Sequence, residues 1–143
     1  MAIIAGAGRL QANGLGLGFT KPAVCLYDFA VDGGGTTAIN LRGNSTIPVG
    51  AIITDTLLRV ETPLTGGTVT DTVQLNAEGA ADLQAAAARN ASPWSTAGVR
   101  RLTLDADAAP VELTAERTIQ LKVNGTAVTA GKFKLIVWYV ELA

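Results

Sequence analysis

The sequence predicts an all-β domain: a β-sandwich or barrel-like fold with one short helix and a glycine-rich N-terminal arm. Two observations predict this class. Short runs rich in Val, Ile, Leu and Thr recur along the chain, and Gly, Pro, Asn or Thr turns separate them at nearly regular spacing. We expect about seven to nine strands. At 143 residues the chain can bury enough surface to fold as one domain without a disulfide or a metal.

The first part of the chain, residues 1–22, is an arm that differs from the β-rich body, residues 23–143. Glycines at positions 6, 8, 14, 16 and 18 make a regular element costly in backbone entropy. Leu15, Leu17 and Phe19 alternate with them, and a large apolar side chain gains roughly 1.5 to 3 kcal/mol on full burial. We therefore expect the arm to dock on its own body or on a neighbouring subunit, with these three residues at the interface.

The body begins with a strand pattern over residues 24–31. The glycines at 33–35 separate it from a second run at 37–41, which favours a hairpin. A long strand is predicted over residues 51–61, apolar on both faces near Leu57, as expected of a strand that is central or at an interface. Residues 68–76 alternate apolar side chains with threonines, which suits a half-solvated sheet.

The one predicted helix covers residues 80–90, which are mostly alanine and contain no Gly or Pro. Leu83 is its only large apolar residue, so we expect it to bridge strands rather than to nucleate the core. Further strands are predicted at 99–104, 117–123 and 132–142. Asn124-Gly125 is the hairpin signal between the last two, although residues 129–131 could supply the reversal instead.

Two residues have alternative roles to weigh. Trp94 lies in a predicted loop, where a tryptophan either caps the edge of a core or anchors an interface. Both roles stay open from the sequence, and we count Trp94 among the candidate interface residues. Cys25 is the single cysteine and lies in an apolar stretch, so we expect a small buried hydrophobic residue and no intramolecular disulfide.

No catalytic, cofactor-binding or metal-binding residue is predicted. The chain has no histidine, the commonest general base and zinc ligand. Gly6 and Gly8 lack the third glycine of a dinucleotide fingerprint, and the pair at positions 105 and 107 lacks the further oxygen ligands of a calcium loop. Asp55 and Asp71 could meet across paired strands, but solvated or turn-stabilising carboxylates are the favoured interpretation.

Charge disfavours nucleic acid and membrane as partners. Eleven basic and twelve acidic residues give a formal net charge of −1, and the longest basic run is the pair Arg100-Arg101. The apolar start of the chain is too short for a signal peptide or a membrane span. A single cysteine agrees with assembly in a reducing cytoplasm.

Three segments, residues 27–43, 47–53 and 129–140, resemble a group of small structural proteins of tailed bacteriophages, the capsid decoration (cement) or minor head proteins. The resemblance covers most of the chain and rests on turn and strand patterns. It implies a virion protein that binds the outside of an icosahedral capsid and cements neighbouring subunits of the major capsid protein, often as a trimer, after assembly in the host cytoplasm. It carries over no catalytic residue.

Two other functions remain from the sequence. One is a tail or head-completion structural component of the same kind of particle, which low charge and an apolar arm also suit. The other is a carbohydrate-binding β-sandwich module, which needs only a sheet and exposed aromatics. The chain has only two Trp, two Tyr and three Phe, so few aromatic rings are available to stack on a sugar.

Overall fold

The computed structural model describes residues 19–102 and 110–142. Its strands are β1 (Thr20–Asp28), β2 (Ile39–Asn40), β3 (Arg42–Gly43), β4 (Thr46–Ile47), β5 (Ala51–Thr65), β6 (Thr72–Asn76), β7 (Gln84–Ala88), β8 (Gly98–Arg101), β9 (Val111–Glu112), β10 (Arg117–Thr118), β11 (Gln120–Asn124) and β12 (Ala130–Glu141). The helix α2 spans Phe29–Asp32. The predicted all-β class with one short helix is confirmed, although the helix lies elsewhere in the chain.

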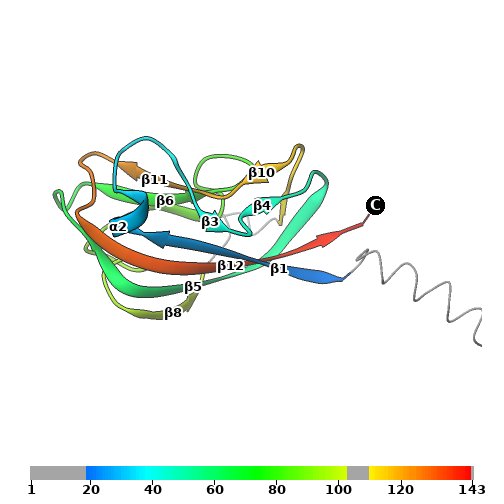
Figure 1. The fold of residues 1–143 in the computed structure, drawn as a ribbon, viewed down its shortest axis with the longest axis horizontal. Helices are drawn as coiled ribbons and strands as arrows, with labels where there is room; N and C mark the ends of the chain where they lie inside the picture. Colours follow the sequence, from blue (N-terminus) through cyan, green and yellow to red (C-terminus); the bar gives the residue numbers. More distant parts are fainter. Residues whose placement is uncertain (1–18, 103–109, 143) are drawn as a thin grey trace, which may run out of the picture.

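The strands form two facing layers (Figure 1). One is a six-stranded sheet in the order β3-β1-β12-β5-β8, with β9 also paired to β5. The other is a four-stranded sheet in the order β2-β11-β6-β7, and β10 pairs with β4 in a separate ribbon. This is a β-sandwich, in which the inner faces of the two sheets form one core.

The six-stranded sheet is built on its three longest strands, which are all antiparallel. β12 pairs along its length with β1 on one side and β5 on the other, and Ile136 lies opposite both Val24 and Leu57. β5 is therefore a central strand between β12 and β8, as the apolar pattern at residues 51–61 predicted. The strand predicted at residues 132–142 is confirmed as β12.

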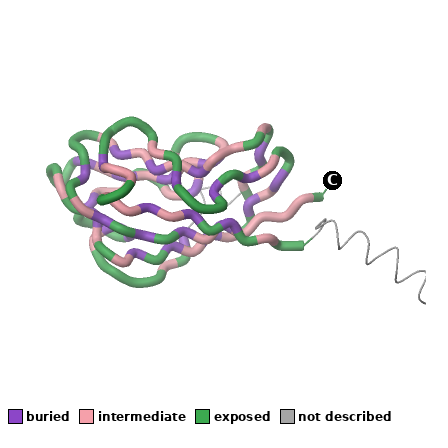
Figure 2. Tube along the Cα trace, viewed as in Figure 1, coloured by how far each residue is buried: buried purple, intermediate pink, exposed green. Residues whose placement is uncertain are grey.

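Buried residues alternate with more exposed ones along these strands, as the colours in Figure 2 show. In the four-stranded sheet the core receives Val73 and Leu75 from β6, and Leu121 and Val123 from β11. In the six-stranded sheet it receives the odd-numbered residues 23–27 of β1 and 133–137 of β12, including Cys25, which is fully buried as predicted. Burial raises the pKa of the Cys25 thiol to about 12, so the thiolate is not populated near neutral pH.

An aromatic cluster holds one region of the core together. The ring of Phe133 stacks on Tyr27 with centroids 5.1 Å apart, and Trp94 packs on its other side at 5.7 Å. The indole N–H of Trp94 donates to the carbonyl of Val73 at 3.1 Å. Trp94 therefore ties the segment before β8 to the opposite sheet.

The helix predicted at residues 80–90 is wrong, because residues 84–88 form β7 and pair with β6. A turn precedes β7, in which the Asp82 carboxylate accepts from the amides of Ala77 and Gly79 at 2.7 and 2.8 Å. The turn places Leu83 in the core, where it is fully buried. Ladder hydrogen bonds and this burial outweigh the helix propensity of alanine, which is at most about 1 kcal/mol per residue.

Both predicted hairpins are also wrong, because the paired runs belong to different sheets. β1 lies in the six-stranded sheet and β2 in the four-stranded one, and β12 and β11 are divided in the same way. The two connections cross between sheets side by side, and the amide of Val128 donates to the carbonyl of Gly34 at 3.0 Å. A Cβ at Gly34 would overlap Val128, so this glycine is needed for the close crossing.

Candidate interaction surface

The outward side of the six-stranded sheet carries a continuous set of apolar side chains, which we call the apolar face. Each of its members is exposed or of intermediate burial. They are Pro22, Val24 and Leu26 of β1, Ile136, Trp138 and Val140 of β12, Ile52 and Leu57 of β5, and Val99 of β8.

The strand register makes the apolar face contiguous. Val24, Ile136 and Leu57 lie in one row across three strands, and Pro22 lies opposite Trp138 in the next row. Directly opposed residues in antiparallel strands have Cβ atoms roughly 5 Å apart. The side chains therefore touch across the strands and form one patch rather than scattered exposed residues.

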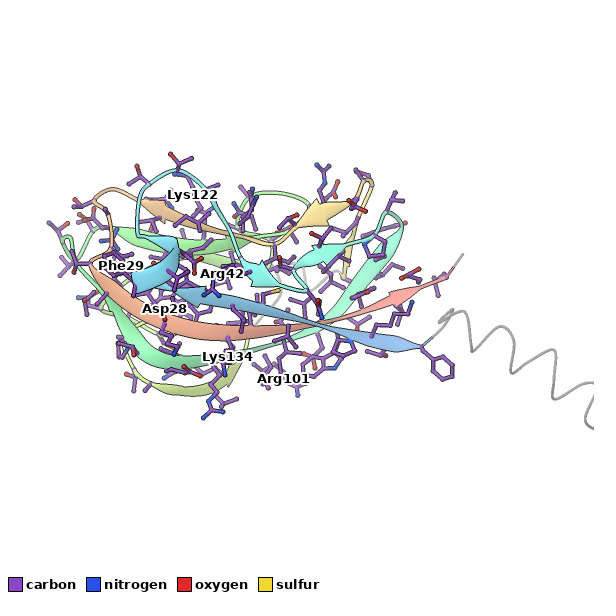
Figure 3. The ribbon with its side chains drawn as sticks, in the orientation of Figure 1. Asp28, Phe29, Arg42, Arg101, Lys122 and Lys134 are labelled. Carbon is purple, nitrogen blue, oxygen red and sulfur yellow. The ribbon has the colours of Figure 1, made fainter. Side chains whose placement is uncertain are left out.

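Charged residues border the apolar face, and several of them form ion pairs within the chain. Arg101 lies 3.1 Å from Asp55, and Glu61 lies 3.4 Å from Lys134 and 3.6 Å from Lys132. Lys134 of β12 and Arg101 of β8 are both labelled in Figure 3, on the side of the six-stranded sheet away from β11. A partner of this surface thus meets an apolar centre with a rim whose charges are partly compensated within the chain.

The pKa of Glu61 reports this pairing. Partial desolvation raises the pKa of its carboxyl group, but the hydrogen bond and charge of Lys134, together with the charge of Lys132, outweigh it and leave the pKa below its usual value. The Glu61 carboxylate is therefore ionised near neutral pH and compensates one of the two positive charges of Lys132 and Lys134.

An apolar patch left in water is a free-energy cost that binding removes, at roughly 25 cal/mol per Å² of apolar surface buried. Large contiguous patches of this kind mark interaction sites on soluble proteins. The apolar face is therefore a candidate docking surface.

A second cluster, around Arg89, is structural. The Arg89 side chain is 3% exposed and donates to the carbonyls of Gly66 at 2.7 Å and Ala127 at 3.3 Å, and to that of Thr126. Beside it, the Asp71 carboxylate accepts from the amide of Thr68 at 2.8 Å. These hydrogen bonds hold together the turns at one end of the sandwich, and the Arg89 guanidinium is used to bind backbone carbonyl groups.

Hydrogen bonding sets the ionisation of Asp71. The backbone amide of Thr68 lowers the pKa of its carboxyl group most, desolvation opposes this, and contacts from Thr126 and the charge of Arg89 lower it further. Asp55 lies in β5, in the other part of the fold, and pairs with Arg101. The structure does not bring Asp55 and Asp71 together, because the strands that carry or follow them belong to different sheets.

Several hollows within the described residues could hold a small molecule. One, of about 380 Å³, lies between the end of β5 and Arg89, and another, of about 480 Å³, lies between residues 76–80 and 116–120; neither has an aromatic side chain in its lining. A third, of about 270 Å³, is lined in part by Tyr27 and Phe133, but both side chains are only 1% exposed. These hollows therefore offer no exposed aromatic ring on which a sugar could stack.

The candidate interface residues of the sequence are placed differently. Phe19 is 49% exposed at the start of β1, whereas Trp94 is fully buried in the chain's own core, the first of its two open roles. Leu15 and Leu17 lie outside the described residues. The apolar face itself was not predicted, although apolar residues on both sides of 51–61 and 132–142 were the available signal.

Within residues 19–102 and 110–142 no group of three or more acidic, cysteine or histidine residues is arranged to hold a metal ion. The pair at positions 105 and 107 lies outside these ranges. In the same ranges no helix is both long and apolar enough to cross a bilayer.

Comparison with solved structures identifies the fold. Three chains from bacteriophage capsids share it. One belongs to the capsid asymmetric unit of cyanophage Pam1, with a TM-score of 0.61, 20% identity, and 85% of this chain and 84% of that chain covered. A chain of the acid-stable capsid of Helicobacter pylori bacteriophage KHP30 has a TM-score of 0.57 and 17% identity, with 87% of this chain and 89% of that chain covered. A chain of the capsid of Ralstonia phage GP4 has a TM-score of 0.55 and 22% identity, with 85% of this chain and 84% of that chain covered.

The covered shares are nearly equal on both sides, so the matched chains are about as long as this one and the similarity spans the whole sandwich. No protein-family model matches the sequence, and no curated protein is similar enough to count as a match. At 17 to 22% identity the three capsid chains share the fold with this protein.

Proposed function

We propose that this protein is a structural component of a bacteriophage virion that binds the outside of the capsid and cements neighbouring subunits of the major capsid protein, as a homotrimer. The observation that carries the proposal is the similarity, over 85 to 87% of this chain, to chains in the capsids of three different phages. It agrees with the resemblance of residues 27–43, 47–53 and 129–140 to decoration proteins. The proposed role needs no catalytic residue, cofactor, nucleic acid or membrane.

The apolar face supports this role physically. A protein that binds an assembled shell but not its dissociated subunits stabilises the shell by mass action. Many identical sites on a closed lattice raise the effective concentration of each further contact. A sandwich with an apolar face on the outside of one sheet can supply such contacts without chemistry.

The two other functions are less well supported. A tail or head-completion component would use the same kind of surface, but the three similar chains all come from capsid structures. A carbohydrate-binding module would need an exposed aromatic platform, and the hollows described above present none, because the two aromatic side chains that line one of them, Tyr27 and Phe133, are buried.

The test is addition of the purified protein to closed capsids that lack it, followed by sedimentation. We expect saturable co-sedimentation in a fixed ratio to the major capsid protein, with protein alone remaining in the supernatant. Binding to isolated tails in place of capsids would support the tail component, and absence of binding to either would overturn the proposal.

A further inference from the structure

The apolar face requires a partner of particular chemistry. The face has nine apolar residues, and part of the charge at its rim is paired within the chain, as Asp55 is with Arg101 and Glu61 with Lys134. A partner segment rich in charged residues would bury those charges against the apolar side chains, at a cost in desolvation. The surface therefore selects an apolar segment that carries few charges.

Residues 1–18 of the same sequence have this composition. Their only charged residue is Arg9, and their large apolar residues are Ile3, Ile4, Leu10, Leu15 and Leu17. The glycines that alternate with the leucines remove the side chains that would hold the backbone away from a flat sheet. Fully extended, 18 residues reach about 60 Å, and a 15-residue strand such as β5 is about 50 Å long. The segment can thus cross the whole face.

Its point of attachment indicates that the face it covers belongs to another copy. Thr20 lies opposite Val140 at the end of the six-stranded sheet, and the odd-numbered residues of β1 that follow, such as Cys25, point into the core. A strand continued backwards from Thr20 would carry Leu15, Leu17 and Phe19 on that inward side, beyond the end of the core. Phe19, just before β1, is 49% exposed, so its own body leaves about half of this side chain uncovered.

We propose that residues 1–18 of one copy lie across the apolar face of a neighbouring copy. Each copy then gives one arm and receives one, which is a head-to-tail contact that can close into a ring such as a trimer. The inference deepens the proposed function, because copies held side by side on a shell would be tied to one another. It requires only self-association, so it can be tested without capsids.

The first test compares association of the full chain, a form without residues 1–18, and the variant Val24→Glu by sedimentation. Val24 lies on the apolar face, so a buried charge there should weaken association about tenfold or more. Removal of residues 1–18 should weaken association to a similar extent. The two changes together should weaken association no more than either one alone, because they remove the same contact. Val69→Glu is the matched control, since Val69 is 68% exposed in the turn before β6.

The second test measures the solvent accessibility of the apolar face through tryptophan fluorescence. It does not depend on the folding of Val24→Glu. The two tryptophans are Trp94, fully buried, and Trp138, on the apolar face. Acrylamide should quench Trp138 more strongly in the form without residues 1–18 than in the associated full chain. The difference should vanish when the full chain is diluted until it dissociates.

Three outcomes overturn the inference. A monomeric full chain with a protected Trp138 means that the arm covers its own face, and equal quenching of both forms means that the arm does not cover the face at all. Protection that appears only on capsids means that the major capsid protein covers the face, which leaves the proposed function standing. Conversely, arm-dependent association without capsid binding supports the inference and overturns the proposed function.

Discussion

At the scale of single residues, a buried guanidinium holds the turns at one end of the sandwich. Arg89 reaches carbonyl groups of two segments far apart in the sequence, at Gly66 and at Ala127. Two glycines make room for this arrangement, because a Cβ at Gly67 or Gly125 would overlap the Asp71 carboxylate and both have positive φ, +73° and +91°. Nothing in the local pattern indicates that Arg89, at the end of an alanine run, is buried.

Arg89→Met should destabilise the fold strongly, because it keeps the apolar stem but leaves the buried carbonyls without donors. Each such group costs roughly 1 to 3 kcal/mol, so we expect a loss of at least about 2 kcal/mol in the free energy of unfolding, measured by urea denaturation. Arg59→Met is the control: Arg59 is exposed on β5, and a change within about 0.5 kcal/mol is expected. Equal effects of the two substitutions would contradict the structural role of Arg89.

Glu78 should make stability depend on pH in the acid range. Hydrogen bonds from the Arg117 guanidinium, at 3.1 and 3.2 Å, and from Thr114 lower the pKa of its carboxyl group to about 2, against partial desolvation. A carboxyl with a lowered pKa in the folded state stabilises it above the ordinary value of 4.5, and this contribution is lost as pH falls towards 2.

Thermal melts of the Glu78→Gln variant should therefore show a lower melting temperature than the unaltered protein at pH 7, with the difference shrinking between pH 4.5 and 2. Glu116→Gln removes the same charge from the neighbouring segment and should leave the melting temperature nearly unchanged at every pH. A constant difference between Glu78→Gln and the unaltered protein across this range would show that the ionised carboxylate is not the cause.

At the scale of elements, the long strands could be predicted and their connections could not. β5, β6 and β12 follow from alternation and β-branched residues within the chain segment itself. Whether two successive strands pair depends instead on contacts with distant segments. The glycines at 33–35 and Asn124-Gly125 are good turn sequences, yet both serve to cross between sheets, because β12 already has β1 and β5 as neighbours.

The segment at residues 80–90 shows the same limit for a helix signal. A lightly packed helix would lose little when Leu83 is shortened, whereas the structure places Leu83 in the core with no exposed surface. We expect Leu83→Ala to cost about 2 to 5 kcal/mol in denaturant unfolding. Leu142→Ala, at a position 65% exposed, should cost far less, and a Leu83 effect as small as that would argue against the buried position.

At the scale of the whole molecule, the strands of the body build the core. Within residues 19–102 and 110–142, the buried core cluster extends from Ala23 to Val137. The fold class followed from sequence alone because it depends on these core strands. The apolar face did not, because which side of a strand faces outwards is decided by the sheet that covers the other side.

Removal of residues 1–18 should therefore leave the melting temperature within a few degrees of that of the full chain while weakening attachment to capsids. A ring of copies linked through arms dissociates from a lattice only when several contacts break together, so loss of the links reduces binding by more than any one contact is worth. The measurement is a titration of undecorated capsids with each form, followed by sedimentation, beside thermal melts of the free proteins. Val69→Glu provides the control for a change on an exposed turn.

A shortened protein that melts normally and binds capsids as tightly as the full chain would show that attachment depends on the body alone. A shortened protein that no longer melts cooperatively would show that the arm belongs to the fold.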